Sequence, residues 1–268
     1  MADIEFHKMH GLGNDFVVLD GRAHPIEITP ARAAAIANRR TGIGCDQLIL
    51  LESSEIADLK MRIFNADGSE VEACGNASRC VVSLMAKDIS IETSGGVITG
   101  QLSDGQVTMD MGQPRFEWNQ IPLDYAMDTS AMPLAWEELA NPAAVNVGNP
   151  HAVFLVDDSS AADLQRLGPI IENDVVFPER VNVNVADIAS GEINLRVWER
   201  GVGLTKACGT GACATAVVLI AAKKVTSPVT VNLPGGSLQI QWKSGGNIQM
   251  TGDAAHVFTG TADLETFG

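Results

Sequence analysis

The chain has 268 residues, and 46% of them are hydrophobic, which is enough for a buried core in one large domain or two of ordinary size. Its 33 acidic residues outnumber the 18 basic ones, and the net charge of −15 comes without any cluster of Lys or Arg. This charge argues against nucleic acids and anionic membranes as partners. The N-terminus lacks the apolar run of a signal peptide, and the longest apolar stretch, Ala212–Ala222, is about half of what a membrane span needs. We therefore expect a soluble protein of the cytoplasm.

The number and spacing of the cysteines argue against disulfides and zinc. The five cysteines are an odd number, no export signal precedes them, and the chain has no Cys-x-x-Cys pair. Free thiols and no metal site are the prediction. Three of the five, Cys45, Cys80 and Cys213, are expected to be core residues.

The chain reads as two similar halves. The tripeptide Ala-Cys-Gly occurs at Ala73–Gly75 and again at Ala207–Gly209, so that the two cysteines lie 134 positions apart, half of the chain length. Residues 61–76 align without a gap over residues 195–210. A duplicated chain with one thiol in the same local setting of each half predicts a site that uses the two thiols as a pair.

In the first half, the strand-like segment Gly11–Asp20 is followed by a helix that Thr29 and Pro30 would cap and open. The further elements that the patterns predict are a helix over Ala31–Arg39, strands at Gln47–Leu51 and Leu59–Phe64, a helix over Asn76–Ala86, and strands within Ile91–Leu102 and Val107–Gly112.

The second half repeats this order. After a connection at Pro114–Ala144, the predicted elements are a strand within Val147–Asp157, a helix over Ala161–Leu167, strands at Val181–Val185 and Ile193–Trp198, a helix over Thr210–Ala222, and strands within Val231–Trp242 and Ile248–Gly252.

The two helices that follow the paired cysteines are apolar on nearly every side, which predicts burial around their whole circumference. The fold class is therefore α+β: two pseudo-symmetric domains, each a mostly antiparallel curled sheet around a central buried helix. We expect domains at 1–115 and 116–256, residues 257–268 packed back onto the first, and an active site between the two.

Each paired cysteine comes just before the opening of its helix. The first N–H groups of a helix lack intrahelical partners and the helix dipole favours negative charge, so a carboxylate would bind there. The same setting is expected to make the thiol ionise more easily than an ordinary cysteine. Two thiols on opposite faces of one carbon suit removal of a proton from one face and its delivery to the other. No nucleotide loop is found, and no cofactor is expected.

Five motifs, in order, point to a family: HGLGNDFVVLD, FNADGSEVEACGN, VGNPH, FPERVNVN and ERGVGLTKACGTGACA. From about His10 to Asp253 the chain resembles the diaminopimelate epimerase family. The resemblance implies interconversion of LL- and meso-2,6-diaminopimelate without pyridoxal phosphate, in lysine and peptidoglycan precursor biosynthesis, with one cysteine of each domain as base and the other as acid. It also implies a homodimer.

The resemblance assigns roles residue by residue. Cys74 and Cys208 would be the catalytic pair, and His151 and Glu199 would support proton transfer. The substrate contacts it implies are Asn14, Gln47, Asn65, Gly75, Asn76, Asn149, Asn182, Glu199, Arg200, Gly209 and Thr210, with backbone N–H groups acting at Gly75-Asn76 and Gly209-Thr210.

Three other functions stay open at this point. A proline or hydroxyproline racemase of the same fold typically carries His after Cys-Gly, whereas Asn76 and Thr210 stand here. A thiol redox switch would cycle Cys74 and Cys208 through a disulfide. A binding module without catalysis would use the same residues only to hold a ligand.

Overall fold

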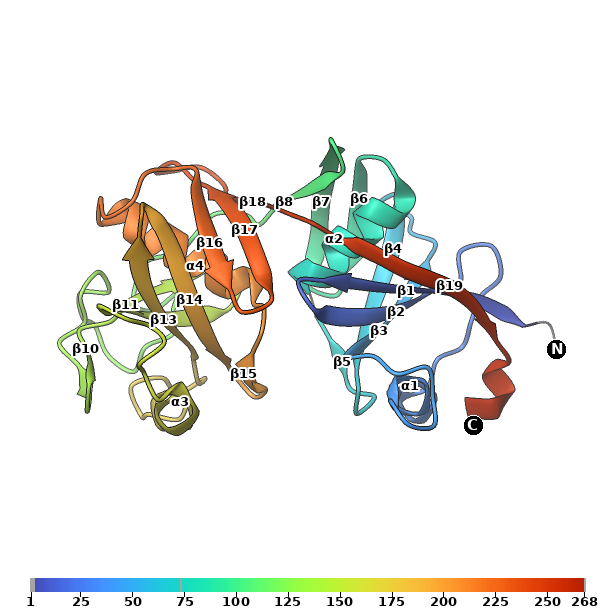
Figure 1. The fold of residues 1–268 in the computed structure, drawn as a ribbon, viewed down its shortest axis with the longest axis horizontal. Helices are drawn as coiled ribbons and strands as arrows, with labels where there is room; N and C mark the ends of the chain where they lie inside the picture. The colour runs from blue at the N-terminus through green and yellow to red at the C-terminus, as the bar shows by residue number, and fades with distance from the viewer. Residues whose placement is uncertain (1–2, 73, 268) are drawn as a thin grey trace. The chain divides into compact units, whose positions relative to one another are not determined.

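The computed structural model describes residues 3–72 and 74–267, so Ala73 of the first Ala-Cys-Gly lies outside the described residues. The chain forms two compact units (Figure 1). Unit 1 is residues Met1–Met109 with Gly252–Gly268, and unit 2 is Asp110–Thr251. The bounds 1–115 and 116–256 stay a prediction from the sequence.

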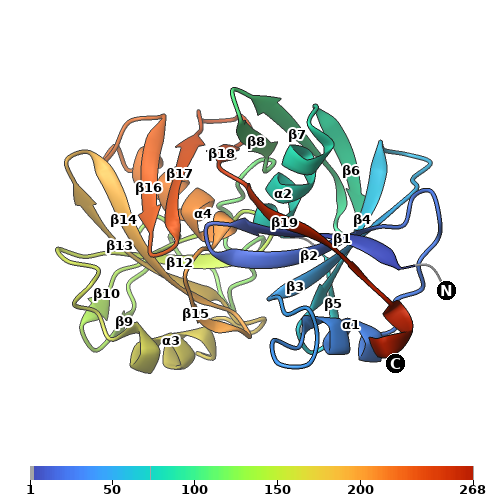
Figure 2. The same cartoon turned by 45° about the vertical axis from the view of Figure 1, so that its right-hand side comes forward.

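Unit 1 is a mostly antiparallel sheet whose last strand comes from the end of the chain. Strands β1 and β19 pair side by side, blue and red in Figures 1 and 2. The parallel pairs are β2–β3 and β4–β6. Its elements are β1 (Ile4–Gly11), β2 (Asn14–Asp20), α1 (Pro30–Ala37), β3 (Gln47–Glu52), β4 (Leu59–Asn65), β5 (Glu70–Val71), α2 (Gly75–Met85), β6 (Ile89–Thr93), β7 (Gly96–Ser103), β8 (Gln106–Asp110), β19 (Ala255–Ala262) and the 3-10 helix η1 (Leu264–Phe267).

Unit 2 repeats the pattern, with β12–β13 and β14–β16 as its parallel pairs. Its elements are β9 (Ala135–Trp136), β10 (Leu139–Ala140), β11 (Ala143–Asn146), β12 (Pro150–Leu155), α3 (Leu164–Glu172), β13 (Asn182–Ala189), β14 (Glu192–Glu199), β15 (Gly203–Thr205), α4 (Gly209–Ala221), β16 (Val229–Leu233), β17 (Gly236–Gln241) and β18 (Gln249–Gly252).

Each unit wraps its strands around one helix, so the predicted α+β class is confirmed. Helix α4 contacts β11, β12, β13, β14, β16 and β17, and it is buried from Gly211 to Leu219 (Figure 2). Helix α2 is buried from Asn76 to Val82, and its last turn is partly exposed. It ends where Ala86 adopts the left-handed conformation (φ 53°).

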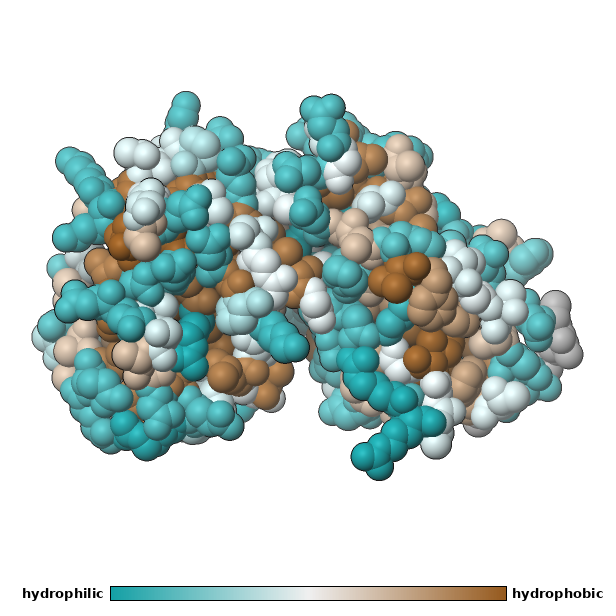
Figure 3. Space-filling model, in the orientation of Figure 1, coloured by the Kyte–Doolittle hydropathy of each residue, from teal (hydrophilic) through white to brown (hydrophobic). Residues whose placement is uncertain are grey.

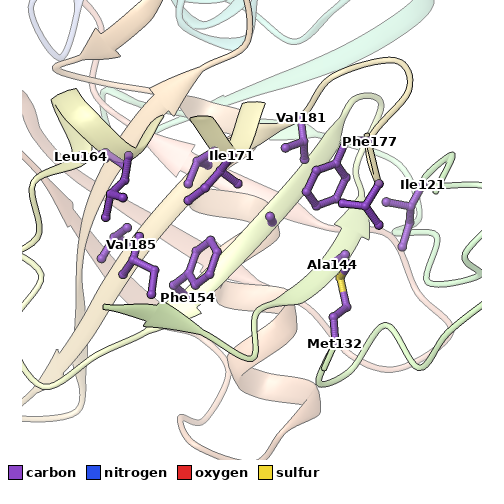
Figure 4. Packing of buried hydrophobic residues seen from close by; sticks show 14 of the residues in the cluster. Ile121, Met132, Ala144, Phe154, Leu164, Ile171, Phe177, Val181 and Val185 are labelled. Carbon is purple, nitrogen blue, oxygen red and sulfur yellow. The ribbon is translucent and has the colours of Figure 1, made fainter. Parts of the chain in front are cut away.

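Successive side chains of a strand point to opposite faces of its sheet, and the central strands of both units are buried on both faces. In unit 1, Val17, Leu48 and Phe64 pack against α1 on the face opposite α2. In unit 2, Ala152, Val183 and Val185 belong to the cluster that contains the buried side of α3, in which Leu164 and Ile171 pack near Phe154 (Figure 4). The residues between these positions therefore face α2 or α4.

Two sequence predictions need correction. Helix α3 begins at Leu164 rather than Ala161, because the Asp163 side chain accepts a hydrogen bond from the Arg166 N–H and caps the helix there. Residues 114–144 are more than a connection: Ile121, Met132 and Leu139 lie in the core of unit 2. The apolar residues of this segment are isolated from one another and lie among prolines, so they show no helix or strand periodicity that would predict their burial.

Helix α3 depends on a glycine where it crosses Trp198. A Cβ at Gly168 would lie 2.4 Å from Cδ2 of the indole, which is held by a 2.7 Å hydrogen bond from its Nε1 to Glu172. We expect Gly168→Ala to lower the free energy of unfolding by about 1–3 kcal/mol, measured by urea denaturation. Gly95→Ala is the control, since its added Cβ would meet nothing closer than 3.6 Å. Equal stabilities of the two variants would contradict this account.

Candidate active site

Cys74 is the residue before the first turn of α2. Its backbone is extended (φ −148°, ψ 111°), and its carbonyl accepts the first helical hydrogen bond, from Ser78 N at 2.9 Å. Gly75 and Asn76 follow as the first helical residues, so their backbone N–H groups have no carbonyl of a preceding helical turn to donate to. The thiol is partly exposed at this end of the buried helix.

The side chains around Cys74 are amides with fixed orientations. Asn14 donates from Nδ2 to Asp46 Oδ2 at 3.1 Å, which leaves its Oδ1 to accept from Cys74 Sγ at 3.8 Å and from Asn76 Nδ2 at 3.3 Å. The buried Arg79 guanidinium donates to Asn76 Oδ1 at 2.7 Å. Since the oxygen of Asp46 accepts and the guanidinium of Arg79 can only donate, both amide groups are fixed in direction.

Gln47 and Asn65 form a second pair on neighbouring strands of unit 1. Gln47 donates from Nε2 to Asn65 Oδ1 at 3.0 Å, and Asn65 donates to Ser69 Oγ at 3.1 Å. Gln47 Oε1 is buried and has no hydrogen-bond partner among the described residues. This oxygen is an acceptor that a ligand ammonium could use.

Cys208 occupies the equivalent place before α4 in unit 2 and is buried (φ −129°, ψ 108°). Its Sγ accepts from Gly211 N at 3.4 Å and lies 3.5 Å from Thr210 Oγ1. Burial raises the pKa of Cys208 well above its ordinary value, and the neighbouring Glu199 carboxylate raises it further. The expectation that the helix start would ease ionisation is wrong here, because desolvation of a thiolate outweighs the helix end.

Glu199 lies beside this thiol at the end of β14. Burial raises the pKa of Glu199, and hydrogen bonds from Thr205 and Cys208 oppose that shift. Thr205 Oγ1 donates to Glu199 Oε1 at 2.5 Å. Thr205 is not among the site residues expected from the sequence. Its place beside Glu199 follows from the β14–β15 hairpin, which no spacing rule indicated.

His151 is fully buried between two asparagines. Its Nε2 lies 2.9 Å from Asn149 Oδ1, and its Nδ1 lies 3.0 Å from Asn184 Nδ2. Burial lowers the pKa of His151 to about 3, so the ring is neutral. Asn184 was also missed, although it stands in the motif FPERVNVN two residues after the predicted Asn182, on the same face of the strand.

Asn182 and Arg200 are joined at the end of the same sheet. Asn182 donates to Pro150 O at 2.8 Å and accepts from the backbone N–H of Arg200 at 2.9 Å. The Arg200 guanidinium donates to Glu179 O at 2.9 Å.

Of the remaining predicted residues, Gly209 is the first residue of α4, and a Cβ there would meet Met250 Sδ at 3.1 Å.

The predicted residues thus gather into local groups within each unit. Unit 1 brings together Asn14, Cys74 and Asn76, and separately Gln47 with Asn65. Unit 2 brings together Glu199, Cys208 and Thr210, and separately Asn149 with His151 and Asn182 with Arg200. Each group stands on the ends of central strands or on the first turn of the buried helix.

The strand register shows where the two units differ. Phe16 pairs with Gln47 across β2 and β3, as His151 pairs with Asn182 across β12 and β13. Two residues further along, Ile49 stands where unit 2 has Asn184. The buried polar network of unit 2 is therefore apolar in unit 1.

Comparison with protein families identifies one match over most of the chain. The family described as "Diaminopimelate epimerase" matches residues 6–117 and 143–257. The diaminopimelate epimerase of Rhizorhabdus wittichii is 64% identical over 99% of this chain and 97% of its own length. The diaminopimelate epimerase of Sphingopyxis alaskensis is 61% identical over 100% of both chains.

Solved structures of low identity share the fold. A phenazine biosynthesis protein of the PhzF family from Enterococcus faecalis has a TM-score of 0.71 at 12% identity, covering 98% of this chain and 100% of its own. A hydroxyproline epimerase from Agrobacterium vitis, solved with trans-4-hydroxy-L-proline, has a TM-score of 0.67 at 17% identity, covering 98% and 91%. At these identities the likeness concerns the fold alone.

Two features are absent from residues 3–72 and 74–267. No three His, Cys, Asp or Glu side chains in this part of the chain are grouped as metal ligands would be. None of the helices described there is both long and apolar enough to cross a membrane.

The buried neutral His151 makes stability depend on pH. Between its folded pKa of about 3 and its ordinary 6.5, the unfolded chain binds a proton that the folded chain does not, so stability falls as pH falls through this window. In His151→Gln, the free energy of unfolding should fall less steeply with falling pH than in the wild type, by up to about 1.4 kcal/mol per pH unit. The measurement is urea denaturation between pH 6 and 4.5. The exposed His24, replaced by Gln, is the control. An unchanged slope in His151→Gln would contradict the buried neutral state.

Proposed function

We propose, from the membership of this chain in the diaminopimelate epimerase family, that it interconverts LL- and meso-2,6-diaminopimelate by a two-base proton transfer between Cys74 and Cys208. The observation that carries the proposal is the repeated arrangement of a thiol immediately before a buried helix, in a chain 64% identical to a diaminopimelate epimerase. It is an isomerase, and the remaining roles below belong to the proposal.

The reaction moves one proton at one carbon. A thiolate removes the α-proton from one face, and the electron pair of the broken C–H bond remains on the α-carbon and its carboxylate. The thiol of the other cysteine then delivers its proton to the opposite face. The configuration is inverted, and the two cysteines have exchanged protonation states, so the next turnover runs in the reverse direction or follows proton exchange with water.

The helix starts would stabilise the negative charge of the intermediate. When the α-proton leaves, charge develops on the carboxylate oxygens, and fixed N–H donors lower the energy of such a state more than groups that must reorient. Gly75-Asn76 and Gly209-Thr210 provide such donors at the first turns of α2 and α4.

The raised pKa of Cys208 suits a proton donor. As a neutral thiol it is ready to deliver a proton while Cys74 acts as base. In the opposite direction Cys208 must first lose its proton, and a substrate ammonium nearby would favour that loss. Once formed, a thiolate of high pKa is the stronger base toward a weakly acidic C–H bond.

The polar groups suit a substrate with two amino-acid ends. Diaminopimelate offers two carboxylates and two ammonium groups, and the proposed contacts offer both kinds of partner. Gln47 Oε1 and Asn14 Oδ1 are acceptors, whereas the first-turn N–H groups and Arg200 are donors. Glu199 supplies a partly buried carboxylate for an ammonium or for the thiol of Cys208.

Two other functions compete with this one. A proline-type racemase of the same fold would act on a smaller, cyclic amino acid and would leave part of the polar set without partners. A redox switch would need Cys74 and Cys208 to act as a disulfide, and would show no exchange at carbon.

The test is solvent exchange at the α-carbon. In deuterium oxide, the wild type should incorporate deuterium from both diaminopimelate isomers while interconverting them, and Cys74→Ser and Cys208→Ser should each lower epimerisation by at least about 100-fold, since each removes an acid or base. Cys213→Ser is the matched control, because Cys213 is a buried cysteine within α4 to which no catalytic role is assigned. Turnover of L-proline alone would overturn the substrate, and full activity of an oxidised Cys74–Cys208 pair would overturn the mechanism.

We also propose that the chain forms a homodimer. Val257 and Phe258 on β19 are about half exposed, and Figure 3 shows hydrophobic side chains among hydrophilic ones on this face of unit 1. Light scattering should give a mass twice the 28.3 kDa of the chain. Val257→Asp should lower that mass toward one chain, whereas Val175→Asp, at a site 84% exposed in unit 2, should not. A monomeric wild type would overturn the proposal.

The cytoplasm is the compartment we propose. The five cysteines are thiols that no disulfide joins in the structure, and the cytosol keeps thiols reduced. Both proposed catalytic groups must remain thiols, since a disulfide can neither remove nor deliver a proton.

A further inference from the structure

The buried Asn184 has an amide whose direction is fixed. Its Nδ2 lies 3.1 Å from Ala152 O, a carbonyl that can only accept, and 3.0 Å from His151 Nδ1. Turning the amide over would place its oxygen against that carbonyl oxygen. The NH₂ group therefore donates to both atoms. Its own Oδ1 stays buried without a hydrogen-bond partner among the described residues, which costs stability.

This donor fixes the tautomer of His151. Because Nδ1 accepts from Asn184, it carries no hydrogen, and a neutral imidazole then carries its hydrogen on Nε2. The ring is fully buried and neutral, so there is a single N–H to place. Nε2 donates it to Asn149 Oδ1 at 2.9 Å.

The direction of the Asn149 amide follows. Its oxygen is engaged by the His151 N–H, so its NH₂ group is turned away from the buried ring. Asn149 is only half-buried, at the start of β12, where a ligand can reach it. The side chain therefore turns its two N–H donors away from the ring, while its oxygen is held by His151.

The matching asparagine of unit 1 has the opposite polarity. Gly13-Asn14 corresponds to Gly148-Asn149 in the repeat, but Asn14 donates its Nδ2 to Asp46 and points its oxygen to Cys74 and Asn76. In unit 1, the place of Asn184 is taken by Ile49, which cannot orient a ring, and the place of His151 by Phe16, which has no N–H. The repeat thus offers an acceptor in one unit and a donor in the other.

We infer that Asn184 is a positioning residue that fixes the His151 tautomer and thereby makes Asn149 a donor for a carboxylate oxygen of the substrate. The inference rests on the proposed function in taking Asn149 as a substrate contact. Unlike the catalytic pair, Asn184 touches no substrate. Its effect passes through two hydrogen bonds.

The first test is the tautomer itself, which needs no activity. Nitrogen-15 NMR of the histidine-labelled wild type at pH 8, with His151 assigned from the signal lost in His151→Gln, should show hydrogen on Nε2 and none on Nδ1. In Asn184→Leu the ring should populate both tautomers. Asn194→Leu is the matched control, since this amide in the same sheet bonds to Asp187 and not to His151. Hydrogen on Nδ1 in the wild type would overturn the inference, even if Asn184→Leu fails to fold.

The second test concerns the group that Asn149 binds. Asn149→Asp keeps an acceptor for His151 but turns a negative oxygen to the ligand, whereas Asn149→Leu only removes the donors. For a carboxylate partner, KM for diaminopimelate should be at least roughly tenfold higher in Asn149→Asp than in Asn149→Leu, with a smaller difference in kcat. Equal KM values would contradict a carboxylate partner, and a lower KM for the aspartate variant would mean that an ammonium is bound there.

The outcomes separate this inference from the proposed function. A wild type that fails to interconvert the diaminopimelate isomers but holds hydrogen on Nε2 would overturn the function and leave the tautomer assignment standing. An active wild type with hydrogen on Nδ1 would overturn only the role of Asn184.

Discussion

The arrangement of each unit depends on one helix that is buried from its first turn. Because strands surround α2 and α4, the polar start of each helix must lie at the end of a sheet, where the strands also end. Cys74 and Cys208 precede those starts, so each thiol is placed among the side chains of strand ends. A surface helix could present a thiol, but it could not place that thiol beside the polar side chains of strand ends such as Asn14 and Glu199.

Burial on this scale decides the chemistry of the side chains. Cys208 remains a thiol and His151 remains neutral because the charged forms would lose their hydration without a compensating charge. The same burial makes hydrogen-bond direction permanent, since an amide that cannot reach water keeps the partners it has. Through the neutral ring of His151, Asn184 thereby fixes the direction in which the Asn149 amide points.

The duplication explains both the likeness and the difference of the units. The shared scaffold repeats the parallel pairing of β2–β3 in β12–β13 and the position of the helix start. At Phe16 and Ile49, unit 1 keeps an apolar face against α2, whereas unit 2 carries His151 and Asn184 toward α4. Asn65 and Glu199 differ in the same way, one neutral and one acidic. A reaction at only one of the two amino-acid ends of a substrate, with an acid and a base in different units, would use such differences.

The sequence by itself determined the duplication, the class of fold, the two helix starts and the residue types around them, because periodicity and local motifs record local structure. Only the tertiary structure decided which groups pair: Thr205 with Glu199, Asn184 with His151, and residues 114–144 with the core of unit 2. It also reversed the expected ionisation of Cys208. Burial and hydrogen-bond direction are set by segments distant along the chain, and no spacing within one motif contains them.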